Sequence, residues 1–376
     1  MNLLEYEIVT TSPMFASRNG KTFELTSQSV RGVLRFWFRA VLPRVLNIHY
    51  YNGQEENFIG LKKAEELIFG STKRKSSFDV IIEEIDVQKS RNTDEFAPGR
   101  YNKYGIYGVE NREFLKEDSK IKITFVIKDE KIKELLNNLL ILTSLVGGFG
   151  AKSRKGFGSF KINNLDNVKL GDVLNKIDEE NKKIFLNDKF ELKPTEFNGE
   201  VADYPVLVRG YYKSFSNDKK YKSFKDVYNY LFRTAQSFNQ KGVYTKTKLK
   251  LRKKGGDSFK TAIYDVEKNK GERNIVFHQS ILGLPINYKT WDGQHKGLSG
   301  GNYSLKSKKT DRKASPLFIS VHKNDNGYTI SFLVLKSRLT NNEPNLIFQK
   351  AGKRIFVKGN ENYDELIEEL KNNVRG

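Results

Sequence analysis

A glycine-rich segment at residues 147–160, GGFGAKSRKGFGSF, combines residue types that suit phosphate binding. It holds five glycines and three cations, which are Lys152, Arg154 and Lys155. Glycine lets a backbone approach a partner closely and point several N–H groups in one direction, and cations beside those groups suit a phosphate chain. The segment therefore predicts a phosphate-binding loop. A tight turn whose glycines only relieve strain is the alternative.

Two familiar phosphate motifs do not fit this loop. A P-loop needs G-x-x-x-x-G-K-[ST] after a strand, and here Ala151 stands in place of the second glycine. A dinucleotide-binding loop would need a third glycine, where this chain has Ser153. Residues 155–158 match the start of the aromatic strand signature of RNA-recognition motifs, but Ser159 departs from it. We add to the three cations four further candidate RNA contacts: Gly148, Gly150, Ser153 and Phe157.

A second group of cations has helical spacing. Arg31, Arg35 and Arg39 repeat every four residues within a mostly apolar segment, so they form one stripe on a helix predicted over residues 30–42. Burial of an uncompensated charge costs roughly several kcal/mol, so the stripe requires anions. Two interpretations stay open: acidic side chains pair with the arginines, or the arginines line a groove that binds phosphate.

More cations lie close to this stripe in the sequence. Arg44 extends the basic end of the helix, and a Ser/Thr-rich loop adds Lys73, Arg74 and Lys75. We include these four residues among the candidate RNA contacts. Trp37 is expected in the core, whereas Phe157 and nearby tyrosines are expected to offer stacking surfaces.

The elements that must position these residues alternate in type. Apolar periodicity predicts strands over 4–10, 80–87, 121–127 and 156–162, and helices over 30–42, 61–69 and 131–146. This β–α–(β)–β–α–β order is that of a ferredoxin-like or RNA-recognition-like sandwich, an α+β fold with helices on one face of an antiparallel sheet. Ser27 or Ser29 is expected to cap the arginine helix. Gly147 and Gly148 are expected to end the helix over 131–146 with positive φ.

The second half is less regular. We predict a strand over 206–212, a helix over 224–238 and a hairpin of residues 317–321 and 328–335 around Asn326-Gly327. A terminal helix is expected around residues 366–370. Flexible basic loops are expected over 241–260 and 291–313. The domain boundary is predicted near Pro194, which gives domains 1–195 and 196–376.

The composition favours a polyanionic partner. The 376 residues contain 66 Lys and Arg against 45 Asp and Glu, a net charge of +21, which suits nucleic acid or an anionic surface. With no cysteine, disulfides, zinc–thiolate sites and thiol nucleophiles are excluded. The four histidines form no ligand pair, so we expect no metal or other cofactor. Because no apolar run approaches the ~20 residues of a membrane span and no signal peptide is visible, we expect a cytoplasmic protein without a membrane partner.

Five segments together resemble one family: SVRGVLRFWFRA at 29–40, ELIFGS at 66–71, the glycine-rich segment, ILGLP at 281–285 and KASPL at 313–317. In this order they resemble the first subunit of the Cmr (type III-B) CRISPR effector complex, within the RAMP superfamily, over residues 5–335. The resemblance implies two ferredoxin-like domains and no catalytic role. It also implies a place near the 3′ end of the guide RNA, where the subunit helps to bind target single-stranded RNA beside other Cmr subunits. Carried over by position, the arginine stripe and the cations of the glycine-rich segment would face RNA. Loops 88–112 and 241–275 match no pattern of the family.

Two other functions stay open. A metal-independent endoribonuclease that processes guide RNA could use His49 as its general base, with Tyr50 and Tyr51 beside it. A DNA-binding or purely scaffolding subunit is the third interpretation, because charge alone does not separate RNA from DNA.

Overall fold

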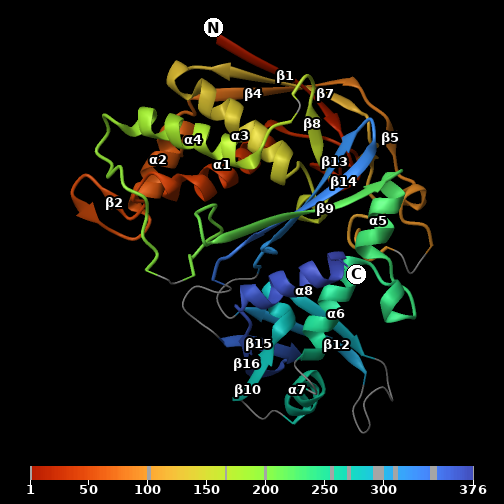
Figure 1. Cartoon of the computed structure of the whole chain (residues 1–376). Coiled ribbons are helices and arrows are strands. Elements are labelled where there is room, and N and C mark those ends of the chain that lie inside the picture. Colours follow the sequence, from red (N-terminus) through yellow and green to blue (C-terminus); the bar gives the residue numbers. More distant parts are fainter. Residues whose placement is uncertain are drawn as a thin grey trace. The chain divides into compact units, whose positions relative to one another are not determined.

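Figure 1 shows a computed structural model of the chain, which describes residues 2–99, 103–165, 167–198, 201–254, 258–268, 272–290, 300–307, 312–338 and 345–375. Its contacts divide the chain into two compact units. The first comprises residues 1–200, 206–229 and 318–335, and the second comprises residues 201–205, 230–317 and 336–376. Both units are discontinuous in sequence, and the boundary after residue 195 stays a prediction.

The first unit is built on a four-stranded antiparallel sheet with the strand order β4-β7-β1-β8. Its strands are β1 (Asn2–Thr10), β4 (Phe78–Asp86), β7 (Lys120–Ile127) and β8 (Phe160–Ile162). Helices α1 (Ser27–Val41) and α3 (Lys133–Val146) lie on one side of this sheet (Figure 1). The chain order β1-α1-β4-β7-α3-β8 is that of a ferredoxin-like domain, so the predicted α+β fold class is confirmed.

Alternation of apolar and polar residues explains which face of this sheet packs against the helices. Ile121, Ile123 and Phe125 of β7 are fully buried, while Lys120 and Lys122 on either side of Ile121 stay partly exposed. On α1 the apolar residues gather on one buried face, which includes Trp37 as predicted. Period-two and period-3.6 patterns thus meet in one core.

The start of α1 differs from the prediction. Thr26 is the N-cap, and its hydroxyl accepts a hydrogen bond of 3.2 Å from the backbone N–H of Ser29. Ser27 and Ser29, the predicted caps, already lie inside the first turn. The extended backbone of Thr26 leaves its side chain free to bend back onto the helix.

Other elements of the first unit complete its frame. They are α2 (Ile59–Phe69), α4 (Leu170–Phe185), a short helix at Leu42–Arg44, and the paired strands β2 (Tyr50–Tyr51) with β3 (Gln54–Glu55) and β5 (Lys89–Ser90) with β6 (Phe114–Leu115). A second sheet has the order β13-β14-β9, with β9 (Tyr212–Tyr221), β13 (Leu317–Asn324) and β14 (Gly327–Leu335). The predicted hairpin is therefore confirmed.

The strand predicted over 206–212 is wrong. Val206 and Leu207 are buried in an irregular segment, where the Leu207 N–H donates to the Ala40 carbonyl at 2.7 Å. The strand begins only at Tyr212. The sequence of β9 does not show the alternation typical of a strand, because both of its faces carry Lys or Ser residues.

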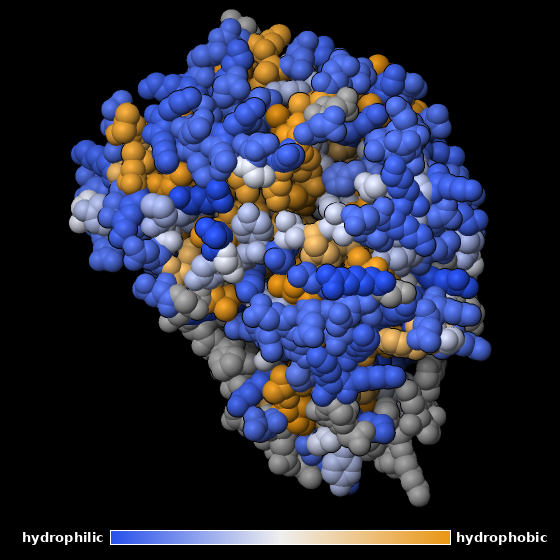
Figure 2. All heavy atoms as spheres, viewed as in Figure 1, coloured by the Kyte–Doolittle hydropathy of each residue, from blue (hydrophilic) through white to orange (hydrophobic). Residues whose placement is uncertain are grey.

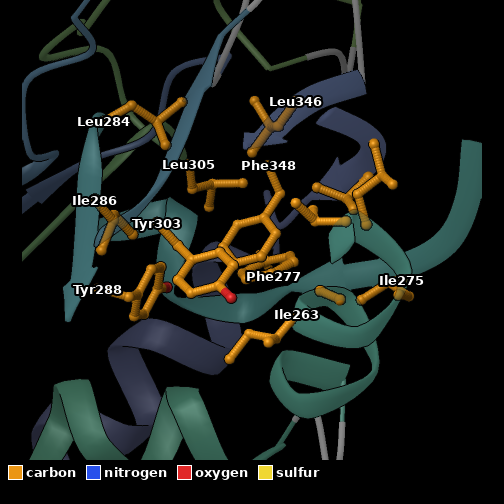
Figure 3. Packing of buried hydrophobic residues seen from close by; sticks show 14 residues of the cluster. Ile263, Ile275, Phe277, Leu284, Ile286, Tyr288, Tyr303, Leu305, Leu346 and Phe348 are labelled. Atoms are coloured by element: carbon orange, nitrogen blue, oxygen red, sulfur yellow. The ribbon is translucent and has the colours of Figure 1, made fainter. Parts of the chain in front are cut away.

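The second unit contains a five-stranded sheet with the order β10-β16-β15-β12-β11. Its strands are β10 (Glu272–Phe277), β11 (Ile286–Thr290), β12 (Gly301–Ser307), β15 (Asn345–Lys350) and β16 (Lys353–Gly359). The pairs are antiparallel except β10 with β16, which is parallel. Tyr303 and Phe348 stack at 5.5 Å inside the core beside this sheet (Figure 3).

The predicted flexible basic loop over 241–260 is wrong in its described part. Residues there form α6 (Val243–Lys254) and the start of α7 (Ser258–Glu267). Lys250 and Lys254 form ion pairs with carboxylates of α8 (Tyr363–Arg375), at 3.1 Å from Glu369 and 2.9 Å from Glu365. The lysines that indicated a loop are thus the polar side of a packed helix. α8 confirms the predicted terminal helix, and α5 (Phe224–Phe232) ends earlier than predicted.

The loop predicted over 291–313 is interrupted by β12, and residues 291–299 and 308–311 lie outside the described residues. In the described part of the chain, no helix is long and apolar enough to cross a membrane. The same residues contain no cluster of three metal-binding side chains.

Candidate nucleic-acid interface

An open pocket of about 670 Å³ in the first unit lies between α1, α2 and the turn at residues 70–76. We call it the arginine pocket. Six cationic side chains line it: Arg31, Arg35, Arg39, Lys62, Arg74 and Lys75. Two carboxylates, Glu65 and Glu66, line it as well. The structure therefore joins two groups of cations that are about 40 residues apart in sequence, and Lys73 is exposed on the same turn.

The arginine stripe is half-exposed rather than buried. The side chains of Arg31, Arg35 and Arg39 are 28%, 35% and 46% exposed. Arg31 donates to Asp79 and to the Phe78 carbonyl, both at 2.8 Å. Hydrogen bonds from Lys128 and Arg31 lower the pKa of Asp79. The ion-pair interpretation is therefore correct for these arginines, which still line an open pocket.

Glu65 serves two arginines at once. Its carboxylate lies 3.3 Å from Arg35 Nε and accepts a hydrogen bond of 2.8 Å from Arg39 Nη2, with a second bond from Arg39 Nε. Arg35 also donates to the Phe69 carbonyl at 3.2 Å and lies over the Phe69 ring. One negative charge therefore neutralises only part of two positive charges.

The remaining cations of the pocket account for its excess of positive charge. Lys62, Arg74 and Lys75 are exposed and have no carboxylate partner among the described residues. In that same part of the chain, the Nε atom of Arg31 is buried without a hydrogen-bond acceptor, and Arg35 Nε, although 3.3 Å from Glu65, forms no hydrogen bond. Guanidinium donors and lysines around an open hollow suit phosphate oxygens. The pocket can therefore bind an anion.

Lys62 and Glu65 are not among the residues predicted from the sequence. They lie three residues apart on one side of α2, directly before the basic turn. This spacing could have placed them beside the turn cations. The arginine partners of Glu65 on α1, however, lie more than 20 residues upstream, and only the fold brings them together.

The glycine-rich segment forms a packed turn. The N–H groups of Phe149, Ala151 and Gly158 donate to the carbonyls of Gly158, Phe15 and Pro13. A Cβ on Gly150 would lie 2.2 Å from the Phe15 oxygen, and Gly150 has φ of +85°. The prediction that loop amides hold phosphates is wrong for these three groups. The glycines instead let two backbones touch.

The predicted positive φ at Gly147 and Gly148 is also wrong. Gly147 ends α3 with φ of −138°, and a Cβ there would lie 2.9 Å from Trp37 Nε1. A Cβ on Gly148 would lie 2.6 Å from the Gly158 carbonyl oxygen. Close packing, rather than backbone conformation, requires both glycines.

Two of the three loop cations, Arg154 and Lys155, lie over aromatic rings. The guanidinium of Arg154 lies 5.1 Å from the Phe36 ring and 4.5 Å from the Phe318 ring, and burial lowers its pKa to about 10. Lys155 Nζ lies 5.5 Å from the Tyr104 ring. Burial lowers the pKa of Lys152. All three side chains are partly exposed.

The other predicted contacts lie apart from the pocket. Arg44 forms a two-pronged ion pair of 2.8 Å with Asp178 on α4, at 17% side-chain exposure. Phe157 is fully buried against Phe15, Phe96 and Phe224, so protein rings occupy its faces. Ser153 is half-buried and begins a single 3-10 turn.

His49, the candidate general base, lies in a loop after α1. Its ring packs 5.5 Å from the Phe58 ring. Among the described residues no side chain forms a hydrogen bond with that ring. A catalytic histidine usually has such a partner to fix its tautomer.

Comparison with known proteins fits this architecture. The model of the RAMP superfamily matches residues 7–161, the part of the chain that holds both the ferredoxin-like sheet and the arginine pocket. The CRISPR system Cmr subunit Cmr1-2 of Pyrococcus furiosus is 32% identical over 190 residues, which are 44% of this chain and 97% of that protein. The Cmr subunit Cmr1-1 of the same organism is 26% identical over 219 residues, 54% of this chain and 62% of that protein.

A solved structure shows the same fold. The crystal structure of Cmr1 from Pyrococcus furiosus in its apo form aligns with a TM-score of 0.56 at 15% identity, over 98% of this chain and 96% of that one. Given the 32% identity across nearly all of the first relative, the chain belongs to the Cmr1 family of RAMP proteins.

Proposed function

We propose that the chain is a non-catalytic RNA-binding subunit of a type III-B Cmr ribonucleoprotein in antiviral defence. It binds guide RNA near its 3′ end, helps to bind target single-stranded RNA, and assembles with other Cmr subunits in the cytoplasm. The observation that carries this proposal is the arginine pocket, where six cations face two carboxylates. The relatives' designation as Cmr subunits supports the assembly.

The proposed mechanism is sequence-tolerant. Arginine forks and lysines contact phosphate oxygens, which carry no base information. Lys62, Arg74 and Lys75 supply the uncompensated charge, and the three α1 arginines supply directed donors. Lys73 and the loop cations Lys152, Arg154 and Lys155 extend the proposed surface. We assign no RNA contact to Phe157, which is buried in the core, or to Arg44, which is paired with Asp178.

A salt series tests this function directly. The purified chain is titrated with a fluorescent single-stranded RNA and with its DNA twin between low and high salt. Each neutralised phosphate contributes about −0.7 to the log–log salt slope, so one contact for each of the six pocket cations predicts a slope of about −4 on RNA. Undetectable binding at low salt, or a clear preference for DNA, would contradict the proposal.

The same samples distinguish the nuclease alternative. Labelled repeat RNA is incubated with the chain in the presence of EDTA and analysed for discrete products. We expect intact RNA. Discrete cleavage that disappears in a His49→Ala variant would replace our proposal with a metal-independent ribonuclease.

A further inference from the structure

Glu65 is placed where an RNA phosphate would bind. Its carboxylate bridges Arg35 and Arg39 across the floor of the arginine pocket, and its side chain is only 14% exposed. Guanidinium forks recognise carboxylates and phosphates through the same paired donors. The side chain thus accepts the paired donors of Arg39, as a phosphate would, and lies 3.3 Å from Arg35 Nε.

We infer that Glu65 is an internal competitor of RNA, a carboxylate that occupies the phosphate site of the free chain and that RNA must displace. The inference rests on the proposed RNA-binding function and adds a residue that sets affinity. It also implies selection for polyanions, because a ligand must offer more than one negative charge to repay the lost Glu65 contacts.

The charge balance makes displacement feasible. A phosphate that replaces Glu65 keeps Arg35 and Arg39 paired and also lies near Lys62, Arg74 and Lys75, which lack carboxylate partners among the described residues. Arg35 and Arg39 are 35% and 46% exposed, so solvent screens their ion pairs with Glu65 and the release of Glu65 to solvent is not prohibitive. A short anion only replaces Glu65 at the two arginines. An RNA strand replaces Glu65 and also contacts Lys62, Arg74 and Lys75.

Glu66 provides a matched control. It is the next residue on α2 and lines the same pocket, but it forms no ion pair with any residue the structure describes. Glu65→Gln and Glu66→Gln change the net charge equally. A difference between them therefore reports the contacts of Glu65 and not the general field of the protein.

The test compares the RNA affinities of the two variants with that of the wild type at one salt concentration. We expect Glu65→Gln to tighten binding roughly two- to fivefold, the equilibrium factor of a partly exposed ion pair. Glu66→Gln should change it by less than about 1.5-fold. Unchanged or weaker binding in Glu65→Gln, or an equal gain in both variants, would overturn the inference.

Two further variants keep the outcomes distinct. Glu65→Asp, whose shorter side chain cannot bridge both arginines, should also bind more tightly, and it replaces Glu65→Gln if that variant does not fold. In an Arg35→Ala, Arg39→Ala background the gain from Glu65→Gln should vanish. If the arginine substitutions weaken binding but neither Glu65 variant tightens it, only this inference fails. If the wild type does not bind RNA, the proposed function fails with it.

Discussion

At the scale of single residues, Glu117 has an unusual ionisation. Burial raises the pKa of Glu117 to about 7; Lys323 opposes this shift, and Asp118 and Glu95 reinforce it. Its Oε2 atom is buried without a hydrogen-bond partner in the described part of the chain. In the folded protein this carboxyl therefore keeps its proton at pH values where an unfolded chain would lose it.

This difference predicts a pH dependence of stability. Between the unfolded pKa of about 4.5 and the folded pKa of about 7, the folded state binds more protons, so stability falls as pH rises. Glu117→Gln should remove that slope and raise the free energy of unfolding at pH 8 by about 1–2 kcal/mol, with little change at pH 4.5. Urea unfolding at both pH values measures it. An equal effect at the two values would contradict the account.

The arginine stripe shows what residue spacing can and cannot predict. Spacing by four identified Arg31, Arg35 and Arg39 as one group and raised the question of their anions. Asp79 and Glu65 are those anions, but they lie on β4 and α2, and no local sequence pattern links them to α1. The partner of a charge is a property of the tertiary fold.

At the scale of elements, α1 links the two basic regions of the first unit. Its arginines line the pocket, while Phe36 contacts Arg154 of the glycine-rich segment and Trp37 lies against Gly147. The packing of that segment therefore helps to position α1.

Two glycine substitutions test this view of the turn. Gly150→Ala should destabilise the protein by more than about 2 kcal/mol, because the new Cβ would strike the Phe15 oxygen at a positive φ. Gly32→Ala, on the exposed side of α1 with open space around it, should stabilise by roughly 0.5–1 kcal/mol. Thermal unfolding of both variants measures the contrast. A tolerated Gly150→Ala would mean that the turn is not held as described.

Strongly periodic elements were predictable and weakly periodic ones were not. The β–α–β–β–α–β order of the first unit follows from apolar spacing in segments such as β7 and α3. Strand β9 was missed because its polar faces lack alternation. Helix α6 was missed because its lysines obscure the buried Tyr244, Thr247 and Leu251. Both depend on partners distant in sequence.

At the scale of the whole molecule, charge surplus and charge placement must be separated. A net charge of +21 predicts affinity for any polyanion. Hydrophilic residues cover most of the face seen in Figure 2, so a polar surface by itself does not define a site. We propose something narrower: the six cations of the arginine pocket carry the RNA contacts, and the three without carboxylate partners among the described residues supply the net positive charge.

The most direct measurement compares two triple variants of equal charge in the RNA salt series. One removes the pocket cations without an ion pair among the described residues, with Lys62→Ala, Arg74→Ala and Lys75→Ala. The other removes exposed lysines at α4, outside the pocket, with Lys169→Ala, Lys176→Ala and Lys182→Ala. We predict that the pocket variant loses RNA affinity and that its salt slope becomes shallower by about 2, at about 0.7 per phosphate. The α4 variant should keep the affinity and the salt slope of the wild type. Equal losses in both variants would show that RNA responds to net charge alone and would contradict the account.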